Sequence, residues 1–336
     1  MKVIVTTSAN PFHYGHLSLY NEAVKIFGNN NVKIAIGKNI NKNIDFNRIV
    51  YHIKPYKINY EIAENITLSD YCKDNDISYI IRGIRNAVDA EYELKLDFLN
   101  KEINPHIQTM FFPTKHIFSN ISSSSINELL KYDKINIVKK YMNEDAMYRF
   151  INKSPEFIVF FGKSCIGKTY YLENVMFKNK NIHTVNVDKI FWDVFEECYG
   201  NDLKNKIYTD SRELIYNNHN LDDLIINYST NDFWNTFFNY IRTHYNKYNI
   251  KNCINLDINI NNDVYLLDFP SIGCYWKTIP SYLKGKLYLI LLNNSDKNRK
   301  LYINSKNFQN KIEFLDNNYK EPNYFDEIIN IGDNNE

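Results

Sequence analysis

The chain has 336 residues, with 40 Lys and Arg against 39 Asp and Glu, for a formal net charge of +1. Its length favours two domains, and its near-neutral charge argues against a protein that binds nucleic acid through a massed basic surface. The five cysteines have no regular spacing, and no apolar run approaches the roughly 20 residues of a membrane span. We therefore expect a cytoplasmic protein with neither a membrane nor a nucleic-acid partner.

Apolar, β-branched runs alternate with helix-period segments through the first half of the chain. Strands are predicted at 3–6, 32–36, 79–82 and 109–112, and helices at 17–27, 88–102 and after residue 122. Between residues 38 and 67 we expect a helix that ends at a proline, followed by a short strand. In the helix at 88–102, a stripe of Tyr92, Leu96, Leu99 and Ile103 predicts a core-facing side. The alternation predicts an α/β domain with a parallel sheet wrapped by helices.

A polar stretch with one proline, around 143–155, separates this half from a second alternation of strands and helices. Strands are predicted there at 156–161, 184–187, 264–267 and 287–292, with a long aromatic-rich helical stretch at 222–248. We place two α/β domains at residues 1–145 and 155–332. Because no internal repeat is present, they are expected to be different domains rather than duplicates.

The first candidate site is the stretch "SANPFHYGH", Ser8 to His16, where the first strand gives way to the first helix. The first amides of a helix lack helical partners and its dipole is positive there, so we expect an anion at this point. Gly15 would let a phosphate approach the backbone. His13 and His16, three residues apart, project to one side and can donate hydrogen bonds to phosphate oxygens. On the motif alone, a helix cap with two incidental histidines is an equal alternative.

Further polar residues follow two later strands of this half. Arg82 and Arg85 come just after a strand and can clamp phosphate oxygens, while Glu93 in the next helix is placed to accept a ribose hydroxyl. The serines at 122–125 open another helix and predict a second anion nest. Alternatively, these serines only cap that helix, with Glu128 as the partner of the cap.

These residues together resemble the phosphopantetheine adenylyltransferase family, part of the nucleotidyltransferase superfamily that carries His-x-Gly-His or Thr-x-Gly-His. The similarity runs from Met1 to about Tyr141 and is most specific in "IIRGIRNAVDAEYE". It implies a Rossmann-like nucleotidyltransferase fold and adenylyl transfer from ATP to 4'-phosphopantetheine, giving dephospho-CoA and pyrophosphate. Because the incoming phosphate is already an anion, positioning and charge neutralisation would carry the catalysis.

Matched by position, the resemblance implies that Ser8 and His16 bind the phosphates and stabilise the transition state. His13 occupies the variable first position of the motif, and Lys42 matches the family's phosphate-binding lysine. Further positions match the family's nucleotide-binding and phosphate-loop residues: Arg82, Arg85, Glu93, Ser122, Ser123 and Ser124. The opening departs from the family's usual GTFDP, because Asn10 replaces an acidic residue and Ser8 replaces threonine. The implied catalytic residues are His16, Lys42 and Arg82.

The second candidate site is "GKSCIGKT", from Gly162 to Thr169, which fits G-x-x-x-x-G-K-[ST] between a predicted strand and helix. The pattern predicts a phosphate-binding loop with Gly162 and Gly167, in which Lys168 reaches the β- and γ-phosphates and Thr169 holds Mg²⁺. The alternative is a glycine turn with a chance lysine. Asp188, at the end of the next strand, can take a proton from an attacking hydroxyl, or equally cap the helix that follows.

The order of features from Glu156 to about Gly332 resembles the dephospho-CoA kinase family. The resemblance implies a P-loop kinase fold, with Asp188 as the base for the 3'-hydroxyl, Asp268 ordering Mg²⁺ through water and Arg299 in the lid. The first acid of the family's Asp-x-Asp pair is Asn186 here, and the family's His-Pro pair is absent.

The two resemblances support each other, since the product of the first reaction is the substrate of the second. We therefore predict a bifunctional enzyme of coenzyme A biosynthesis that uses ATP, 4'-phosphopantetheine, dephospho-CoA and Mg²⁺. One alternative is a nicotinamide-mononucleotide adenylyltransferase joined to a ribosylnicotinamide kinase, against which "RGIRNAVDAEYE" speaks. Another is an active adenylyltransferase with a non-catalytic ATP-binding module. Whether the chain forms a homo-oligomer stays open at this level.

Overall fold

The computed structural model describes residues 1–37, 45–163, 165–216, 227–251, 253–269, 273–295, 299, 316 and 325–331. The chain divides into two compact units, Met1–Lys153 and Ser154–Glu336. Both contain a parallel sheet flanked by helices, so the predicted α/β class is confirmed. We describe each unit by itself.

The first unit is built on a five-stranded parallel sheet with the order β3-β2-β1-β4-β5. Its strands are β1 (Lys2–Thr7), β2 (Val32–Gly37), β3 (Tyr60–Ala63), β4 (Ile77–Ile84) and β5 (Gln108–Pro113). Its helices are α1 (Tyr14–Phe27), α2 (Phe46–Ile53), α3 (Leu68–Asp74), α4 (Ala87–Ile103), α5 (Ser123–Lys131), α6 (Ile135–Val138) and α7 (Glu144–Asn152), with 3-10 turns η1 (Asn29–Asn31), η2 (Lys54–Tyr56) and η3 (His116–Phe118).

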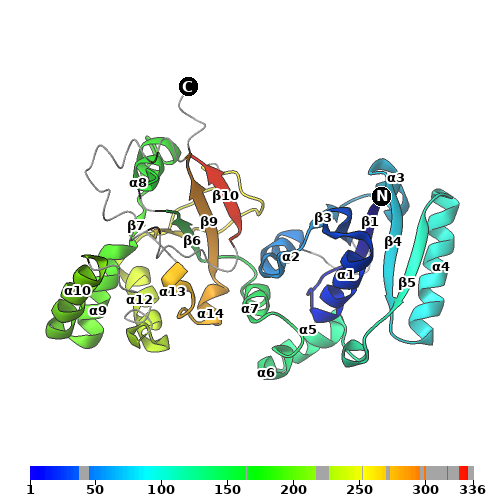
Figure 1. Cartoon of the computed structure of the whole chain (residues 1–336), viewed down its shortest axis with the longest axis horizontal. Helices are drawn as coiled ribbons and strands as arrows, with labels where there is room; N and C mark the ends of the chain where they lie inside the picture. The colour runs from blue at the N-terminus through cyan, green and yellow to red at the C-terminus, as the bar shows by residue number, and fades with distance from the viewer. Residues whose placement is uncertain are drawn as a thin grey trace. The chain divides into compact units, whose positions relative to one another are not determined.

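Strand β1 lies at the centre of this sheet because its side chains are apolar on both faces. Val3 and Val5 pack into one core cluster, which includes residues of α1 and α2, whereas Ile4 packs into another, which includes residues of α3. In Figure 1, α1 and α2 lie on one side of the sheet and α4 lies on the other. The chain winds outward from β1 to β3 and then returns to β4 on the other side. The winding direction therefore reverses between β1 and β4, which is where open α/β sheets bind ligands.

Helix α4 corrects one prediction, because its apolar stripe does not face the core. Tyr92, Leu99 and Ile103 are 59%, 61% and 47% exposed, and of the predicted stripe only Leu96 is half-buried. The helix instead turns a partly polar side inward, where Glu93 forms an ion pair with Arg82 on β4. Hydrophobic periodicity gives no sign of this charged contact.

Helix α7 occupies the stretch that we predicted as a polar linker. Asn143 caps it by accepting from the amide of Ala146. Its apolar residues are buried, with Phe150 against Arg48 and His52 of α2 and Met147 in a cluster with residues of α5 and α6. Two arginines contribute to this packing, with Arg48 lying 3.6 Å over the ring of Phe150. The first unit therefore continues to Lys153, beyond the expected end of the domain at residue 145.

The second unit has a five-stranded parallel sheet with the order β10-β9-β6-β8-β7. Its strands are β6 (Phe157–Phe161), β7 (Val185–Asn186), β8 (Tyr265–Asp268), β9 (Leu287–Asn293) and β10 (Glu327–Asn330). Its helices are α8 (Lys168–Tyr171), α9 (Val187–Tyr199), α10 (Asn201–Tyr216), α12 (Asn231–His244), α13 (Gly273–Trp276) and α14 (Ser281–Lys284), with a π-helical turn η4 (Leu172–Met176). Of the helix predicted at 222–248, Asn231–His244 form α12, which ends before the predicted boundary because Tyr245 is extended and Tyr248 pairs with Val264.

The core of this unit is aromatic. Helices α9, α10 and α12 gather on one side of the sheet, away from α8 (Figure 1). Phe191 of α9 packs against Phe233 and Trp234 of α12, with ring centroids 5.0 and 6.3 Å apart, and all three side chains are buried. Strand β6 is buried along its whole length, so the loop that follows it starts from a rigid support.

Gly162, the first residue after β6, has no room for a side chain. A Cβ there would lie 2.4 Å from the backbone oxygen of Leu292 on β9. We expect Gly162→Ala to lower the free energy of unfolding of the second unit by about 1–3 kcal/mol, because a backbone atom cannot yield as a side chain can. Thermal and urea unfolding would measure this loss. Gly37→Ala, where an added Cβ meets nothing within 4 Å, is the control and should change stability little. Equal behaviour of the two variants would contradict the packing argument.

Candidate active site

The loop between β1 and α1 is held from outside by helix α5. The side-chain amide of Asn127 donates to the carbonyl of Asn10 at 2.9 Å. The hydroxyl of Ser123, which is buried, donates to the carbonyl of Pro11 at 2.9 Å. Ser123 therefore fixes the loop of the motif, and its hydroxyl proton already has a protein acceptor.

The same loop is held on its other side by residues of α2 and η2. The amide of Phe12 donates to Nε2 of His52 at 2.8 Å, in a buried contact. The hydroxyl of Tyr56 donates to the carbonyl of Phe12 at 3.2 Å and accepts from the amide of Asn143. Phe12 itself is fully buried, so both of its backbone polar groups need these partners.

The amides at the start of α1 are paired within the protein, contrary to the prediction that they are open to an anion. The amide of Tyr14 donates to the carbonyl of Tyr141 at 2.8 Å. His13 is the N-cap, and its Nδ1 accepts from the amide of Gly15 at 3.1 Å. The amide of His13 in turn donates to Nδ1 of His16 at 3.3 Å. A phosphate at this point would therefore meet side chains before backbone amides.

Gly15 is required here by the cap itself. A Cβ on Gly15 would lie 2.8 Å from Cε1 and 2.9 Å from Nδ1 of His13. We expected Gly15 to make room for a phosphate. In the structure, the imidazole of His13 occupies the space beside Gly15, and this packing explains the glycine.

His16 holds its single proton on Nε2. Its Nδ1 accepts from the amide of His13, so the proton lies on the other nitrogen, which is 3.0 Å from the hydroxyl of Thr7. Burial lowers the pKa of His16 well below its usual value, and the neighbouring His13, Arg85, His52 and Arg82 lower it further. The rings of His13 and His16 lie 3.8 Å apart, and burial also lowers the pKa of His13, to about 4. Both imidazoles are therefore neutral at pH 7, and His16 acts as a neutral hydrogen-bond donor.

Arg82 is held at the carboxyl end of β4. Its Nε and one terminal nitrogen donate to the two oxygens of Glu93 at 2.5 and 2.6 Å, and the other terminal nitrogen donates to the hydroxyl of Thr6. Both carboxylate oxygens of Glu93, which we expected to bind a ribose, thus contact Arg82.

Arg85 is held in a similar way just beyond the end of β4. It forms a two-point contact with Asp89, at 2.6 and 3.0 Å, and also donates to the carbonyl of Ile121 at 3.4 Å. Both predicted phosphate clamps are therefore fixed in direction by carboxylates of α4.

The remaining predicted residues of this site have different surroundings. Ser122 is the N-cap of α5 and forms a capping box with Ser125, not with Glu128. Ser124 is exposed and Ser8 is half-buried, and within the described parts of the chain neither side chain has a hydrogen bond. Lys42 lies outside the described residues.

The structure brings together residues that sequence reasoning left apart. Thr7, beside the predicted Ser8, makes the contact with His16, and Thr6 makes the contact with Arg82. Because successive side chains of a strand point to opposite faces, Thr6 and Thr7 make these two contacts from opposite sides of β1. His52 and Tyr56 follow no motif, and nothing in the sequence links them to Phe12.

The second unit places the predicted phosphate loop between β6 and α8. Gly167 has a φ of +86°, a left-handed conformation that glycine adopts without strain. Lys168 begins α8, and its ammonium group contacts the carboxylate of Asp268 at the end of β8. The hydroxyl of Thr169 donates to the other oxygen of Asp268 at 2.8 Å. The loop therefore gathers a lysine, a hydroxyl and a carboxylate at the carboxyl ends of two adjacent strands.

Asp188 lies near this group, in the first turn of α9. The N-cap of α9 is Asn186, whose side chain accepts from the amide of Lys189, so the alternative that Asp188 caps the helix is wrong. Desolvation raises the pKa of Asp188, the negative charge of Asp268 raises it further, and the charge of Lys168 opposes both. A carboxylate with a raised pKa is a better proton acceptor than an ordinary one.

The oxygen atoms of Thr169 and Asp268 are the hard donors that Mg²⁺ prefers, and they lie 2.8 Å apart. They fit the predicted metal position as a pair of ligands. In the ranges that the structure describes, no group of three or more His, Cys, Asp and Glu side chains could hold a metal ion.

Arg299, the predicted lid arginine, is buried and forms an ion pair with Asp316. One of its terminal nitrogens lies 2.7 Å from a carboxylate oxygen. The residues around this pair lie outside the described parts of the chain.

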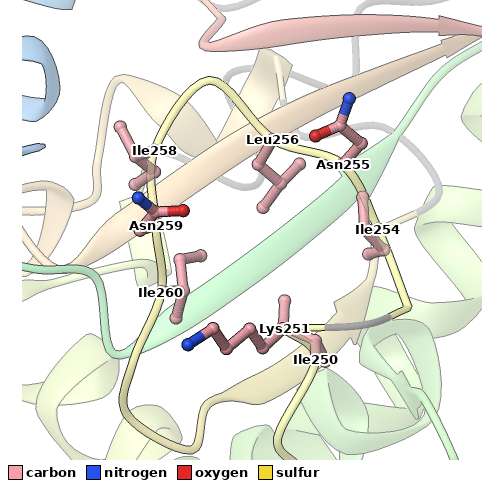
Figure 2. Close-up of a pocket in the computed structure, with 8 residues that line it drawn as sticks. All are labelled: Ile250, Lys251, Ile254, Asn255, Leu256, Ile258, Asn259 and Ile260. Carbon is pink, nitrogen blue, oxygen red and sulfur yellow. The ribbon is translucent and has the colours of Figure 1, made fainter.

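A separate pocket lies in the second unit, inside the loop that runs from Ile250 to Ile260 (Figure 2). Apolar side chains such as Ile254 and Leu256 line it, and Lys251 is the only charged residue among the eight that do. Its volume of about 60 Å³ is far below the roughly 300–1,000 Å³ of ordinary ligand sites. It contains none of the residues predicted to bind nucleotide.

Within the described ranges, no helix combines the length and the hydrophobicity that crossing a bilayer would require.

Comparison with known proteins finds relatives of the first unit. The cytidylyltransferase-like family model matches residues 4–129. Phosphopantetheine adenylyltransferase of Buchnera aphidicola subsp. Schizaphis graminum is 35% identical over 153 residues, which are 43% of this chain and 89% of that protein. Phosphopantetheine adenylyltransferases of Prochlorococcus marinus strain MIT 9312 and Staphylococcus haemolyticus are 36% and 32% identical, over 39% of this chain and 87% and 84% of their own lengths.

The parallel sheet, the histidine motif at the end of β1 and the arginines at the end of β4 define the first unit as a nucleotidyltransferase domain. The matches narrow this class. The chain belongs to the phosphopantetheine adenylyltransferase family.

The buried histidines predict a dependence of stability on pH. Burial lowers the pKa of His13 to about 4 and that of His52 to about 3, whereas an unfolded histidine titrates near 6.5. As the pH falls below about 6.5, the unfolded chain binds protons that the folded unit excludes. Stability that is complete above that pH is then lost, by up to about 1.4 kcal/mol per pH unit for each histidine.

Urea unfolding of the first unit between pH 8 and pH 4.5 measures this slope. His13→Asn keeps a side chain that can cap α1 but cannot titrate, so its slope should be shallower by the share of one histidine. A stability that does not change from pH 7 to pH 5 would show that these histidines are not held neutral.

Proposed function

We propose that the first unit transfers the adenylyl group of ATP to 4'-phosphopantetheine, forming dephospho-CoA and pyrophosphate. The observation that carries this proposal is the placement of His16, Arg82 and Arg85 where the winding of the sheet reverses between β1 and β4, near enough for both arginines to lower the pKa of His16. The named activity of the relatives supports it.

In the proposed reaction, a phosphate oxygen of the acceptor forms a bond to the α-phosphorus of ATP. The bond from that phosphorus to the oxygen bridging to the β-phosphate breaks, and pyrophosphate leaves with the electron pair. The attacking group is already ionised, so no side chain has to remove a proton. The chain contributes alignment and stabilisation of the charge that builds between the phosphates.

His16 suits this task because it is neutral and its Nε2–H is its only donor. The hydroxyl of Thr7 accepts that bond in the free protein, and a phosphate oxygen would take its place. Arg82 and Arg85 supply positive charge, and their carboxylate partners fix the direction of each guanidinium group. Each guanidinium has five N–H groups, so both can still donate to phosphate oxygens.

For the second unit we propose ATP-dependent phosphorylation of the 3'-hydroxyl of dephospho-CoA. The loop from Gly162 to Thr169 would surround the phosphates, and Asp188 would take the proton of the attacking hydroxyl. Thr169 and Asp268 would hold Mg²⁺, which neutralises phosphate charge when it is bound. The contacts among Lys168, Thr169 and Asp268, and the raised pKa of Asp188, support this proposal.

A non-catalytic ATP-binding module is the second candidate for this unit. It is favoured by Asn186, which replaces the first acid of the expected pair. The side chain of Asn186 caps α9. Formation of ADP from dephospho-CoA and Mg-ATP would exclude it.

Replacing His16 tests the first activity. We expect His16→Ala to lower the turnover of adenylyl transfer by about 10²–10³, because a donor aimed at the developing charge is lost. Pyrophosphate release from Mg-ATP and 4'-phosphopantetheine measures this. The control is His106→Ala, an exposed histidine that lies between α4 and β5. Near-normal turnover by His16→Ala would contradict the proposal.

Replacing Lys168 tests the second activity. Lys168→Ala should abolish ADP formation from dephospho-CoA while leaving pyrophosphate release from 4'-phosphopantetheine intact, because the two sites belong to separate units. Lys178→Ala, an exposed lysine in the same unit, should retain both activities. If Lys168→Ala removed both half-reactions, each supplied with its own substrates, independent sites would be wrong.

A further inference from the structure

Two successive peptide groups lead into the N-cap of α1, and each is held at both ends. In the first, the carbonyl of Pro11 accepts from Ser123 at 2.9 Å and the amide of Phe12 donates to Nε2 of His52 at 2.8 Å. In the second, the carbonyl of Phe12 accepts from Tyr56 at 3.2 Å and the amide of His13 donates to Nδ1 of His16 at 3.3 Å. The orientation of the second group decides which nitrogen of His16 faces a donor.

His52 is built to be a fixed acceptor. It is completely buried on α2, and its Nδ1 lies 3.1 Å from the carbonyl of Arg48, to which it donates. Its Nε2 therefore carries a lone pair, which receives the amide of Phe12. The ring of Phe150 packs edge-on against it, with centroids 5.1 Å apart. Burial lowers the pKa of His52 to about 3, so this arrangement persists at neutral pH.

Tyr56 complements His52 on the next peptide group. Burial raises the pKa of its hydroxyl, which therefore stays protonated and can donate to the carbonyl of Phe12. Its ring also packs edge-on against the ring of Phe12, at 4.8 Å. Phe12 in turn lies against the ring of His16, with centroids 5.3 Å apart. Backbone and side chain of Phe12 thus connect the two buried residues with His16.

We propose that His52, together with Tyr56, is a positioning residue of the adenylyl-transfer site, because it fixes the peptide groups that keep the proton of His16 on Nε2. The proposal rests on the function proposed above for the first unit. Neither residue needs to touch a substrate. They act through Phe12 and the amide of His13.

The physical argument concerns the cost of a wrong tautomer. A neutral imidazole has one donor nitrogen and one lone pair. If the amide of His13 turned away from Nδ1, the proton could move to that nitrogen, and Nε2 would then present a lone pair to a phosphate oxygen. Attraction would become repulsion at the atom where negative charge builds. A buried amide of Phe12 without an acceptor would favour such a rearrangement, because it would turn to find another partner.

The test uses the full chain and three variants. His52→Phe keeps a ring of similar size but has no acceptor, His52→Gln supplies an amide oxygen near the position of Nε2, and Tyr56→Phe removes only the hydroxyl. We expect His52→Phe and Tyr56→Phe to lower kcat for pyrophosphate release by about 10- to 100-fold, as misalignment does. KM for ATP should change less than about threefold, and His52→Gln should recover most of the loss. Cys72→Ala is the control, since Cys72 is fully buried in a separate core cluster.

A second measurement separates positioning from activity. Long-range ¹H–¹⁵N correlation spectra of the histidine side chains report which nitrogen of His16 is protonated. We expect the Nε2–H form in the wild type, in His52→Gln and in Cys72→Ala, and a mixture of forms in His52→Phe and Tyr56→Phe. If the wild type catalysed no adenylyl transfer, the proposed function would fail while these spectra would still judge the role of His52.

Three results would overturn the proposal. The first is an unchanged tautomer of His16 in a folded His52→Phe or Tyr56→Phe variant. The second is a loss of kcat in His52→Gln as large as in His52→Phe, because the acceptor would then be irrelevant. The third is an equal loss in Cys72→Ala, which would show that general weakening of the core explains the effect. If His52→Phe did not fold, Tyr56→Phe would decide the question.

Discussion

One hydrogen bond, from the amide of His13 to Nδ1 of His16, organises the first site. It gives a neutral imidazole a single donor direction. Further contacts hold the backbone on both sides of that amide. They are the N-cap contact between His13 and the amide of Gly15, and the contacts of α5, α2 and η2 with the loop of the motif. Because these contacts already use the amides at the start of α1, the site meets anions with side chains rather than with the open end of a helix.

The two units differ in how they hold the side chains and the strand-to-helix loop of their candidate sites. In the first, fixed side chains converge at the end of β1 and β4, and the loop between strand and helix is clamped from outside. In the second, the loop after β6 depends on glycines at 162 and 167, and the charged partners Lys168 and Asp268 neutralise each other. In the function proposed for the second unit, the phosphates of ATP would compete with Asp268 for the ammonium group of Lys168. In the first unit, the side chains of the site are already held in place by protein partners.

Much of the fold could be predicted from the sequence because β-branched runs and helical periods are local. The strand around Val3 and the helix after Ser122 follow from such patterns. Prediction failed where a distant partner overrode the local signal. Glu93 of α4 pairs with Arg82 while Tyr92 faces outward, and the charged residues of α7, including its buried Arg149, make that helix look like a polar linker. His52 could not be found at all, since 40 residues separate it from Phe12 and no motif connects them.

Helix α7 has a practical meaning for dissecting this protein. Its Phe150 supports both the guanidinium group of Arg48 and the ring of His52, so the last helix of the first unit forms part of the scaffold behind the histidine motif. A shortened chain that stopped near residue 145 would lose this backing and expose the apolar face of α2 to water. An isolated N-terminal fragment that keeps its native site should therefore extend through Lys153, although the polar sequence of α7 suggests a linker.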